Sequence, residues 1–271
     1  MRNSDIKMKK EIHHKWVDYC LVSGYELSKD ELDRYSRQIA IPNWGLDGQR
    51  KLKAAKVAII GVGGLGSFSS MSLVAAGVGW VKIIDKQRYE LSNLNRQILG
   101  WQIDVGKHKA EVAKEKLTKL NPNVNIEAEI KEITEDNIID AIHGLDVVVD
   151  GMDNWKTRFI INDACVRERI PFVHAGVSGF WGQITTIVPG KGPCLRCVFA
   201  KSPKQPQIIP IFGATPALLA SLQAMEALKL ILGLGKPLIG RLLFLDGENM
   251  ECNIFDIVRK KDCPVCGSIS F

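Results

Sequence analysis

The sequence predicts an α/β protein whose core is a Rossmann-like, doubly wound and mostly parallel sheet. A β-branched run at 57–60 leads into Gly61-Val-Gly-Gly-Leu-Gly66, which is typical of the first strand-to-helix turn of such a sheet. Strand, loop and helix patterns then alternate to about residue 175. The 271 residues, 46% of them hydrophobic, are enough for one large domain. We expect an amino-terminal helical arm at 1–27 and a single domain at 28–271.

The first part of the chain supplies the elements of the parallel sheet. Ser28 and Glu31 form a capping box, so a helix that carries Arg34 to Gln38 is expected to start there. The expected strands cover 57–60, 80–85, 124–130, 145–150 and 170–175. The expected helices cover 47–53, 67–76, 106–120, 134–144 and 154–169.

The second part departs from this alternation. A strand at 182–188 follows directly on the strand at 170–175, so the sheet is expected to be mixed, with later antiparallel strands that include 242–245 and 253–258. Residues 201–213 hold three prolines and predict a long crossing loop. Thr215-Pro216 predicts the N-cap and first residue of a helix that runs to about Leu232.

The charge pattern disfavours nucleic acid and membranes as partners. The formal net charge of +6 is modest, and the chain lacks a dense arginine cluster with interleaved aromatics. The apolar stretch Leu218–Leu234 is interrupted by Gln223, Glu226 and Lys229, which favours a buried amphipathic helix over a membrane span. The charged amino terminus is unlike a signal peptide, so a cytoplasmic protein is expected.

The glycine-rich stretch predicts a nucleotide-binding turn. Among Gly61, Gly63 and Gly66, one makes the tight turn, one lets backbone amides approach a phosphate, and one lets the helix pack on the strand. The amino terminus of the helix then faces an anion. Asp85, at the carboxyl end of the next strand, can accept hydrogen bonds from ribose hydroxyls. The alternative is a tight turn that holds no ligand.

Three charged residues near the expected strand ends indicate a nucleoside triphosphate. Arg96 can clamp phosphate oxygens with two hydrogen bonds, and Lys109 can act as a point charge. Asp153 follows a parallel strand, where it could hold Mg²⁺, which takes one or two carboxylates plus phosphate oxygens. Each has an ordinary alternative: a surface ion pair for Arg96, an exposed first-turn lysine for Lys109, and an N-cap for Asp153. Asn154 is the other candidate for that cap.

Two C-x2-C pairs predict a structural zinc site. Cys194-Leu-Arg-Cys197 and Cys263-Pro-Val-Cys266 together offer the four thiolates of a closed tetrahedral Zn²⁺ site. Such a site would staple the carboxyl-terminal tail to a distant loop, making a small zinc-stapled lobe without a catalytic role. Four reduced core cysteines or a redox pair are the alternatives.

The other reactive or aromatic candidates are expected to be structural. The five histidines show no metal-ligand spacing and are expected to be surface or packing residues. Phe180 and Trp181 could line a pocket, but an aromatic core position is favoured. Cys165 and Cys252 lie in apolar stretches and are expected in the core.

The motifs, taken in order, resemble one family. They resemble the MoeB/ThiF/HesA adenylyltransferases, which are similar to ubiquitin-activating enzymes, over roughly residues 32–267. The matching motifs are Arg34-Tyr-Ser-Arg37-Gln, Gly61–Gly66, Asp85, Leu91-Ser-Asn-Leu-Asn-Arg96-Gln, Gly106-Lys-His-Lys109, Met152-Asp153-Asn154 and both cysteine pairs.

The resemblance implies an activity and a set of roles. The expected reaction is ATP-dependent adenylation of the Gly-Gly carboxyl terminus of a small ubiquitin-like sulfur-carrier protein, with ATP, Mg²⁺ and Zn²⁺ as cofactors. Arg37 corresponds to an arginine that reaches the neighbouring subunit's triphosphate, which implies a homodimer. The implied catalytic residues are Arg37, Arg96, Lys109 and Asp153. The implied nucleotide and Mg²⁺ contacts are Gly61, Gly63, Gly64, Gly66, Asp85, Ser92, Asn93, Asn95, Arg96, Lys109, Asp153 and Asn154.

One departure from the family limits the expected chemistry. Many relatives carry a cysteine in the crossing loop, whereas residues 198–251 contain none here. The reaction is therefore expected to stop at the adenylate, with sulfur supplied by another protein such as a sulfurtransferase. The thiamine, molybdopterin, tRNA-thiolation and archaeal protein-modification pathways stay open. The alternatives are an NAD-dependent oxidoreductase, which leaves the basic residues without a role, and a non-catalytic scaffold.

Overall fold

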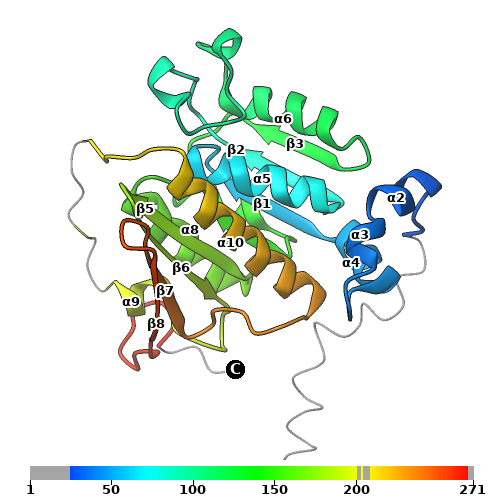
Figure 1. The fold of residues 1–271 in the computed structure, drawn as a ribbon. Helices are drawn as coiled ribbons and strands as arrows, with labels where there is room; N and C mark the ends of the chain where they lie inside the picture. Colours follow the sequence, from blue (N-terminus) through cyan, green and yellow to red (C-terminus); the bar gives the residue numbers. More distant parts are fainter. Residues whose placement is uncertain (1–24, 200–202, 204–207, 268–271) are drawn as a thin grey trace, which may run out of the picture.

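One eight-stranded sheet forms the centre of the molecule, in the order β3-β2-β1-β4-β5-β6-β7-β8 (Figure 1). The structure, a computed structural model, describes residues 25–199, 203 and 208–267, so nearly all of the predicted arm at 1–27 lies outside the described residues. The strands are β1 (Lys56–Ile60), β2 (Trp80–Ile84), β3 (Asn125–Glu129), β4 (Val147–Asp150), β5 (Phe172–Ser178), β6 (Trp181–Ile187), β7 (Arg241–Asp246) and β8 (Glu251–Asp256).

The sheet changes from parallel to antiparallel at β6. Strands β1 to β5 pair in parallel, and β6, β7 and β8 pair antiparallel, which confirms the predicted mixed architecture. The chain runs outward from β1 to β2 and β3 on one side, and then returns to β4 on the other side. In open α/β sheets, ligands bind beside the carboxyl ends of the strands at this kind of reversal.

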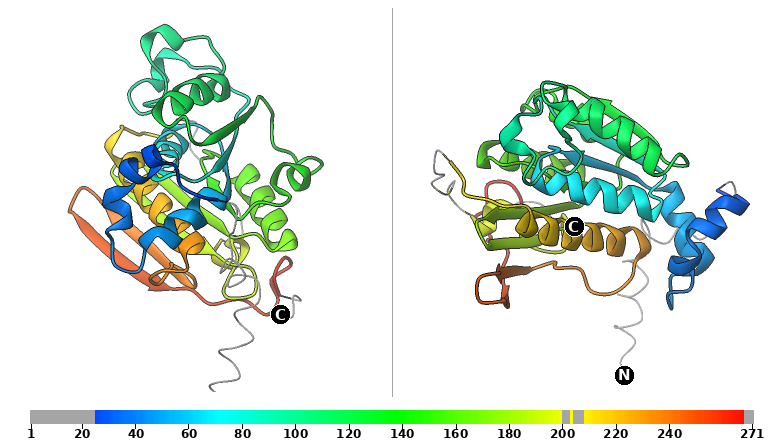
Figure 2. Two further views of the ribbon diagram at one scale, coloured as in Figure 1. Left: turned by 90° about the vertical axis from the view of Figure 1, so that its right-hand side faces the viewer. Right: turned by 45° about the horizontal axis from the view of Figure 1, so that its top comes forward.

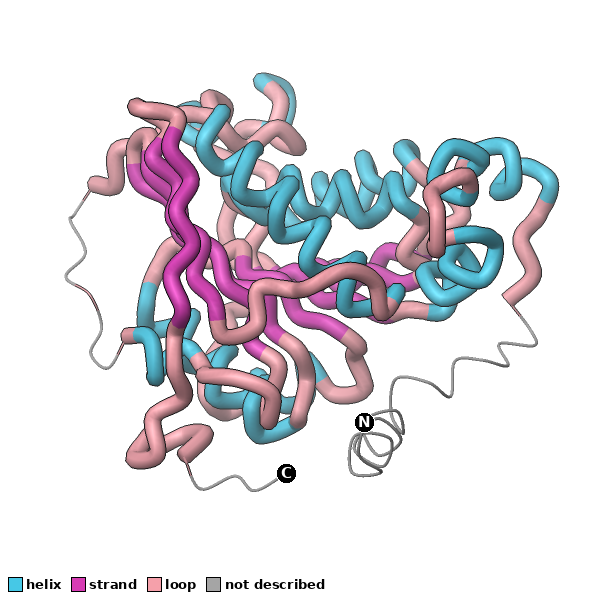
Figure 3. Tube along the Cα trace, turned by 60° about the horizontal axis from the view of Figure 1, so that its bottom comes forward, coloured by secondary structure: helices cyan, strands magenta, loops and turns pink. Residues whose placement is uncertain are grey.

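Helices cover both faces of the sheet (Figures 2 and 3). One face carries α4 (Gly45–Ala54), α5 (Gly64–Ala76), α6 (Lys109–Leu120) and α10 (Ala214–Leu232). The other face carries α7 (Ile138–Ile142), α8 (Trp155–Glu168) and α9 (Leu195–Val198). The short helices α2 (Lys29–Arg34) and α3 (Ser36–Ile39) lie beside α4, and the loop after β2 holds the 3-10 turns η2 (Leu91–Asn93) and η3 (Gln102–Asp104).

Two hydrophobic cores follow from the alternation of side chains along the strands. In β1, Val57 and Ile59 join the core under α5 and α10, whereas Ala58 and Ile60 join the core under α8. All four side chains are buried. A strand covered on both faces reads as a continuous apolar run, and this run was the sequence signal for β1.

Three glycines hold β1, β4 and α5 together by direct backbone contact. A Cβ atom at Gly66 would lie 1.9 Å from the carbonyl oxygen of Gly61, and one at Gly151 would lie 2.0 Å from the same atom. Gly61 itself has a φ of +89°, a backbone conformation that residues with a side chain rarely adopt. The predicted division of roles is confirmed for two positions: Gly61 makes the turn, and Gly66 lets the helix pack closely.

Two helix boundaries differ from the sequence-based expectation. The helix that begins at the Ser28 capping box ends at Arg34, because the next residue, Tyr35, turns inward and its hydroxyl accepts a hydrogen bond from Asn121 Nδ2 at 2.8 Å. Helix α10 begins at Ala214, so Thr215 is not its N-cap. The Thr215 hydroxyl instead donates to the carbonyl of Gly179 at 2.7 Å.

Helix α10 packs as a core helix. Among the described residues, it is the one helix long and apolar enough to cross a membrane, and half of its most apolar window is buried within the protein. It contacts β4, β5, β6 and α5, and Gln223 on its buried side donates to the carbonyl of Asp150 at 2.8 Å. The predicted burial of this amphipathic helix is confirmed.

The close glycine contact makes a testable prediction about stability. Gly66→Ala should lower the free energy of unfolding by about 2–4 kcal/mol, because the new methyl group would overlap the Gly61 carbonyl oxygen. The free-energy cost of this overlap exceeds the gain in helix propensity from alanine, which is about 1 kcal/mol. Gly63→Ala is the matched control, since its Cβ would meet atoms no closer than 3.7 Å. Urea unfolding curves that give the same midpoint for both variants would contradict the prediction.

Candidate functional site

A pocket of about 1330 Å³ opens at the carboxyl ends of β1, β2, β4 and β5. Its wall is formed by the loops that follow these strands and by the start of α5. The predicted residues that line it are Gly61, Gly63, Gly64, Asp85, Ser92, Asn93, Arg96, Asp153 and Asn154. The sheet order therefore brings together most residues that the sequence placed on separate strand ends. Gly66, Asn95, Lys109 and Arg37 do not line the pocket.

Asp85 organises the glycine turn. Its Oδ2 accepts a hydrogen bond from the backbone N–H of Val62 at 2.8 Å, and its Oδ1 accepts one from the N–H of Gln87 at 2.7 Å. The side chain is buried but remains in the pocket wall. Each carboxylate oxygen has room for a second hydrogen bond, so Asp85 keeps the capacity to accept from ribose hydroxyls.

Arg96 and Lys109 occupy different layers of the site. The Arg96 guanidinium lines the pocket, and its Nη1 donates to the Ser92 carbonyl at 2.9 Å and to Asn95 Oδ1 at 2.8 Å. Lys109 is buried behind Gln87, and its Nζ donates to Gln87 Oε1 at 2.7 Å. The exposed-lysine alternative is therefore wrong, and Asn95 serves to orient Arg96.

The charge of Lys109 is balanced by the carboxylates around the pocket. Burial lowers the pKa of the Lys109 ammonium, and the negative charges of Asp85 and Asp153 act in the opposite direction. A cation in this position adds to the positive potential beside the glycine turn. Gln87 was not recognised from the sequence, and the one available signal was its place two residues after Asp85.

Asp153 stands at the pocket as an exposed carboxylate. Asn154 is the N-cap of α8, because its Oδ1 accepts from the N–H of Thr157 at 2.9 Å. This settles the choice between the two candidate caps. A single exposed carboxylate beside a phosphate-binding turn fits Mg²⁺, which takes one or two protein carboxylates and completes its shell with phosphate oxygens and water.

Arg37 lies far from the pocket of its own chain. It is on α3, where the neighbouring Gln38 donates from Nε2 to the carbonyl of Ala76 at 3.0 Å, at the carboxyl end of α5. The amino end of α5 at Gly64 faces the pocket, and its 13 residues span about 20 Å. Arg37 and the nucleotide turn of one chain thus lie at opposite ends of this helix.

Two expectations about individual side chains are wrong. Trp181 is 44% exposed and lines the pocket, and Phe180 is exposed and packs on Phe212, so neither belongs to the core. Cys252 is exposed on β8, the edge strand of the sheet. Cys165 is buried as predicted, and burial raises the pKa of its thiol.

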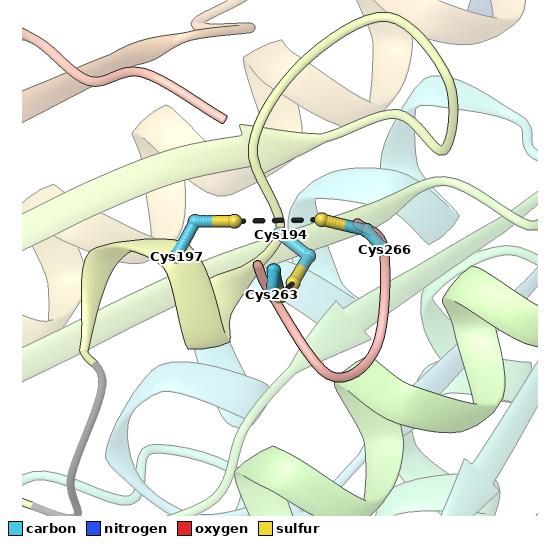
Figure 4. A group of neighbouring side chains, drawn as sticks. All are labelled: Cys194, Cys197, Cys263 and Cys266. Atoms are coloured by element: carbon cyan, nitrogen blue, oxygen red, sulfur yellow. Dashed lines mark hydrogen bonds between the residues drawn. The ribbon is translucent and has the colours of Figure 1, made fainter. Parts of the chain in front are cut away.

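The four paired cysteines form one cluster (Figure 4). Their sulfur atoms all lie within 4.8 Å of one another, with Sγ distances of 3.6 Å between Cys194 and Cys263 and 3.4 Å between Cys197 and Cys266. Sulfur atoms at 2.3 Å from a tetrahedral Zn²⁺ ion lie about 3.8 Å apart, so the cluster fits this metal. The cluster joins α9 to the carboxyl-terminal segment across 69 residues of sequence.

The surroundings of the cluster favour a thiolate at one position. Burial opposes ionisation of Cys263, but hydrogen bonds from the backbone at Cys266 and Val265 lower the pKa of its thiol to about 7. Arg196 lies on α9, two residues after Cys194. Its Nη2 forms an ion pair with Oδ2 of Asp163 on α8 at 2.6 Å. The ion pair and the N–H of Leu195, which donates to Asn162 Oδ1 at 2.7 Å, fix α9 on α8.

Comparisons with known proteins find relatives that match most of the chain. A family model described as the ThiF family matches residues 35–265. The sulfur carrier protein adenylyltransferase of Thermus thermophilus is 43% identical over 251 residues, which cover 89% of this chain and 92% of that protein. The SAMP-activating enzyme E1 of Haloferax volcanii is 41% identical over 247 residues, which cover 89% of this chain and 91% of that protein.

Solved structures share the same architecture. A crystal structure of E. coli MccB with MccA-N7isoASN has a TM-score of 0.79 and 26% identity, and covers 99% of this chain and 83% of that chain. The family model spans most of the present chain, and the two relatives match it along nearly their whole length. The resemblance drawn from the motifs is thereby confirmed: this chain belongs to the ThiF family.

Proposed function

We propose that this protein uses ATP to adenylate the carboxyl-terminal Gly-Gly carboxylate of a small ubiquitin-like sulfur-carrier protein. The observation that carries the proposal is the convergence of the glycine turn, Asp85, Arg96 and Asp153 on one pocket, with Lys109 one layer behind. A dinucleotide pyrophosphate needs only the turn and the acid. A triphosphate carries more negative charge, and the two cations, together with a Mg²⁺ ion that Asp153 would hold, would give it partners.

The proposed reaction is one displacement at phosphorus. A carboxylate oxygen of the carrier forms a bond to the α-phosphorus, and the bond from that phosphorus to the bridging oxygen of pyrophosphate breaks. The carboxylate is already ionised at neutral pH, so no general base is required. The backbone amides at the start of α5 and the side chains of Arg96 and Lys109 hold the phosphates. Asp153 would hold Mg²⁺, which when bound neutralises charge on the phosphate oxygens.

The shape of the pocket supports a peptide substrate next to the nucleotide. Its volume exceeds the 300–1,000 Å³ that is common for small-molecule sites. The wall continues past the glycine turn to Gly176, Ser178 and Gln183 at β5 and β6, and to Trp181 and Phe244 beside them. A pocket of this extent has space for a nucleotide and, beside it, for an extended Gly-Gly tail, which carries no side chains.

The role of Asp153 makes a first prediction for activity. Asp153→Asn should reduce carrier-dependent exchange between ATP and radiolabelled pyrophosphate by at least about 100-fold, because the neutral amide is a poor Mg²⁺ ligand. Asp140→Asn, an exposed aspartate on α7 outside the pocket, is the control. A carrier that lacks its two terminal glycines should support no exchange. Unchanged exchange by the Asp153 variant would refute the assigned role.

The proposed active form is a homodimer in which Arg37 serves the partner's site. Arg37 and the pocket of one chain lie at opposite ends of α5, so this arginine could reach a triphosphate only across an interface. The outer surface of the α5 and α10 layer supports such an interface. Helix α5 contains no charged residue, and Leu218 and Met225 are 45% and 51% exposed on α10.

Mixed dimers test this arrangement. Arg37→Ala and Asp153→Asn, each inactive alone, should regain about a quarter of wild-type exchange when refolded together in equal amounts, since half of the dimers then hold one intact composite site. Arg96→Ala mixed with Asp153→Asn is the control, because both residues belong to the same chain's pocket and no intact site can form. Recovery in the control, or none in the test mixture, would exclude a site shared in this way.

We propose that sulfur arrives from another protein after adenylation. Residues 198–251 contain no cysteine, and Cys165 is buried with a raised pKa. The outer sulfur of a sulfurtransferase persulfide would attack the acyl carbon of the adenylate and expel AMP, which gives an acyl disulfide between the two proteins. A second thiol would then break the S–S bond, forming a disulfide with the sulfurtransferase cysteine and releasing the carrier as a thiocarboxylate. The described cysteines form no disulfide, which supports a reducing compartment, and we place the reaction in the cytoplasm.

We propose that the cysteine cluster holds a structural Zn²⁺ ion. Purified protein should contain about one zinc per chain, and Cys263→Ser should lower both the zinc content and the melting temperature, the latter by about 10 °C or more. Cys252→Ser, at an exposed thiol outside the cluster, should change neither. Metal analysis and a thermal melt measure both quantities, and a zinc-free protein with wild-type stability would disprove the proposal.

A further inference from the structure

A buried polar network at the carboxyl end of β4 has no part in the roles assigned so far. Asp150 and His174 have no exposed surface, and the side chain of Arg158 is 8% exposed. His174 Nδ1 lies 2.6 Å from Asp150 Oδ2, and Arg158 Nε lies 3.2 Å from the same oxygen. A buried charge is costly unless it is paired, so these three side chains depend on one another.

The network holds the peptide bond that leads to Asp153. Asp150 Oδ1 accepts from the N–H of Met152 at 2.9 Å. Arg158 Nη2 donates to the carbonyl of Met152 at 2.6 Å and to the carbonyl of Ala175 at 3.1 Å. Both ends of Met152 are thus fixed by members of the same ion pair. Since the Met152 carbonyl belongs to the peptide bond that precedes Asp153, the network sets where Asp153 enters the pocket.

His174 controls the orientation of the Asp150 carboxylate. The carboxylate only accepts hydrogen bonds, so His174 Nδ1 donates to it. Trp155 and Phe199 lie against the imidazole, with ring centroids at 5.7 Å and 6.3 Å. Within the described residues, His174 Nε2 has no hydrogen-bond partner, so the contact with Asp150 is the one polar link that holds the ring. His174 and Arg158 both contact Asp150 Oδ2, so the other oxygen, Oδ1, is directed at the N–H of Met152.

We propose that His174 is a positioning residue for Asp153. By donating Nδ1–H to Asp150, it fixes the carboxylate that, together with Arg158, holds the Met152–Asp153 peptide in place for metal binding. This inference rests on the proposed function, in which Asp153 holds the Mg²⁺ of the bound nucleotide. Residues that orient a metal ligand without touching the metal change metal affinity by about 10–100-fold when they are replaced.

Three substitutions separate this role from simple packing. His174→Leu fills most of the volume and removes the donor. His174→Asn keeps an amide N–H near the position of Nδ1, and His174→Gln places its amide near the position of Nε2 instead. A packing residue would tolerate leucine at least as well as asparagine, whereas a positioning residue needs the donor and favours asparagine.

The primary measurement is a calorimetric titration with Mn²⁺ in the presence of a non-hydrolysable ATP analogue. It gives the affinity of each variant for the metal. His174→Leu and His174→Gln should weaken Mn²⁺ binding about tenfold or more, and His174→Asn should stay within about threefold of wild type. The Mg²⁺ concentration that half-saturates carrier-dependent pyrophosphate exchange should shift in the same order. Melting temperatures identify a variant that fails to fold, and the comparison of asparagine with glutamine then still decides the question.

Wild-type metal affinity in His174→Leu would overturn the inference. Equal losses in all three variants, in proportion to their melting temperatures, would also overturn it, because they would indicate packing alone. A failure of the proposed function looks different: wild-type protein would then bind the nucleotide and Mn²⁺ without carrier-dependent exchange. In that case the order of the three variants in the Mn²⁺ titration would still support or reject the role of His174.

Discussion

The backbone contact of Gly61 with Gly66 and Gly151 is the constraint on which the site depends. No Cβ atom fits between these backbone segments, since one at Gly66 or at Gly151 would lie 1.9–2.0 Å from the Gly61 carbonyl oxygen. The contact sets the start of α5 beside the end of β4. As a result, the amides that face a phosphate and the peptide that carries Asp153 lie next to each other without any side chain between them.

The charges of the site differ in how deeply they are buried. Asp85, Lys109 and Asp150 are buried, and each is hydrogen-bonded within the protein. Arg96 and Asp153 also line the pocket, and both are less buried than these three residues. Buried groups that are already bonded need not reorganise when the reaction occurs, which is the physical basis of electrostatic preorganisation. The buried charges therefore keep a fixed geometry around the pocket.

Most strands and helices and most pocket residues could be predicted, because their signals are local. The apolar run of β1, the glycine turn and the paired cysteines each depend on a few neighbouring residues. The errors concern burial and caps. Cys252 lies on the exposed edge strand β8, and Trp181 begins β6 in the wall of the pocket, where it is not covered by the core. Thr215 faces Gly179, a partner that no local pattern indicates.

The sequence by itself determined which chemical groups end up at the strand ends, because a strand, its turn and the next helix are contiguous in the chain. Only the tertiary structure decided which of these groups meet. Asp150, Arg158 and His174 come from β4, α8 and β5, and their contact depends on the parallel pairing of β4 with β5. Lys109 lies behind Gln87, and Arg37 lies at the end of α5 opposite to the pocket, because the sheet order and the packing of α3 place them there. Contacts between distant segments follow from that order, which local side-chain periodicity does not encode.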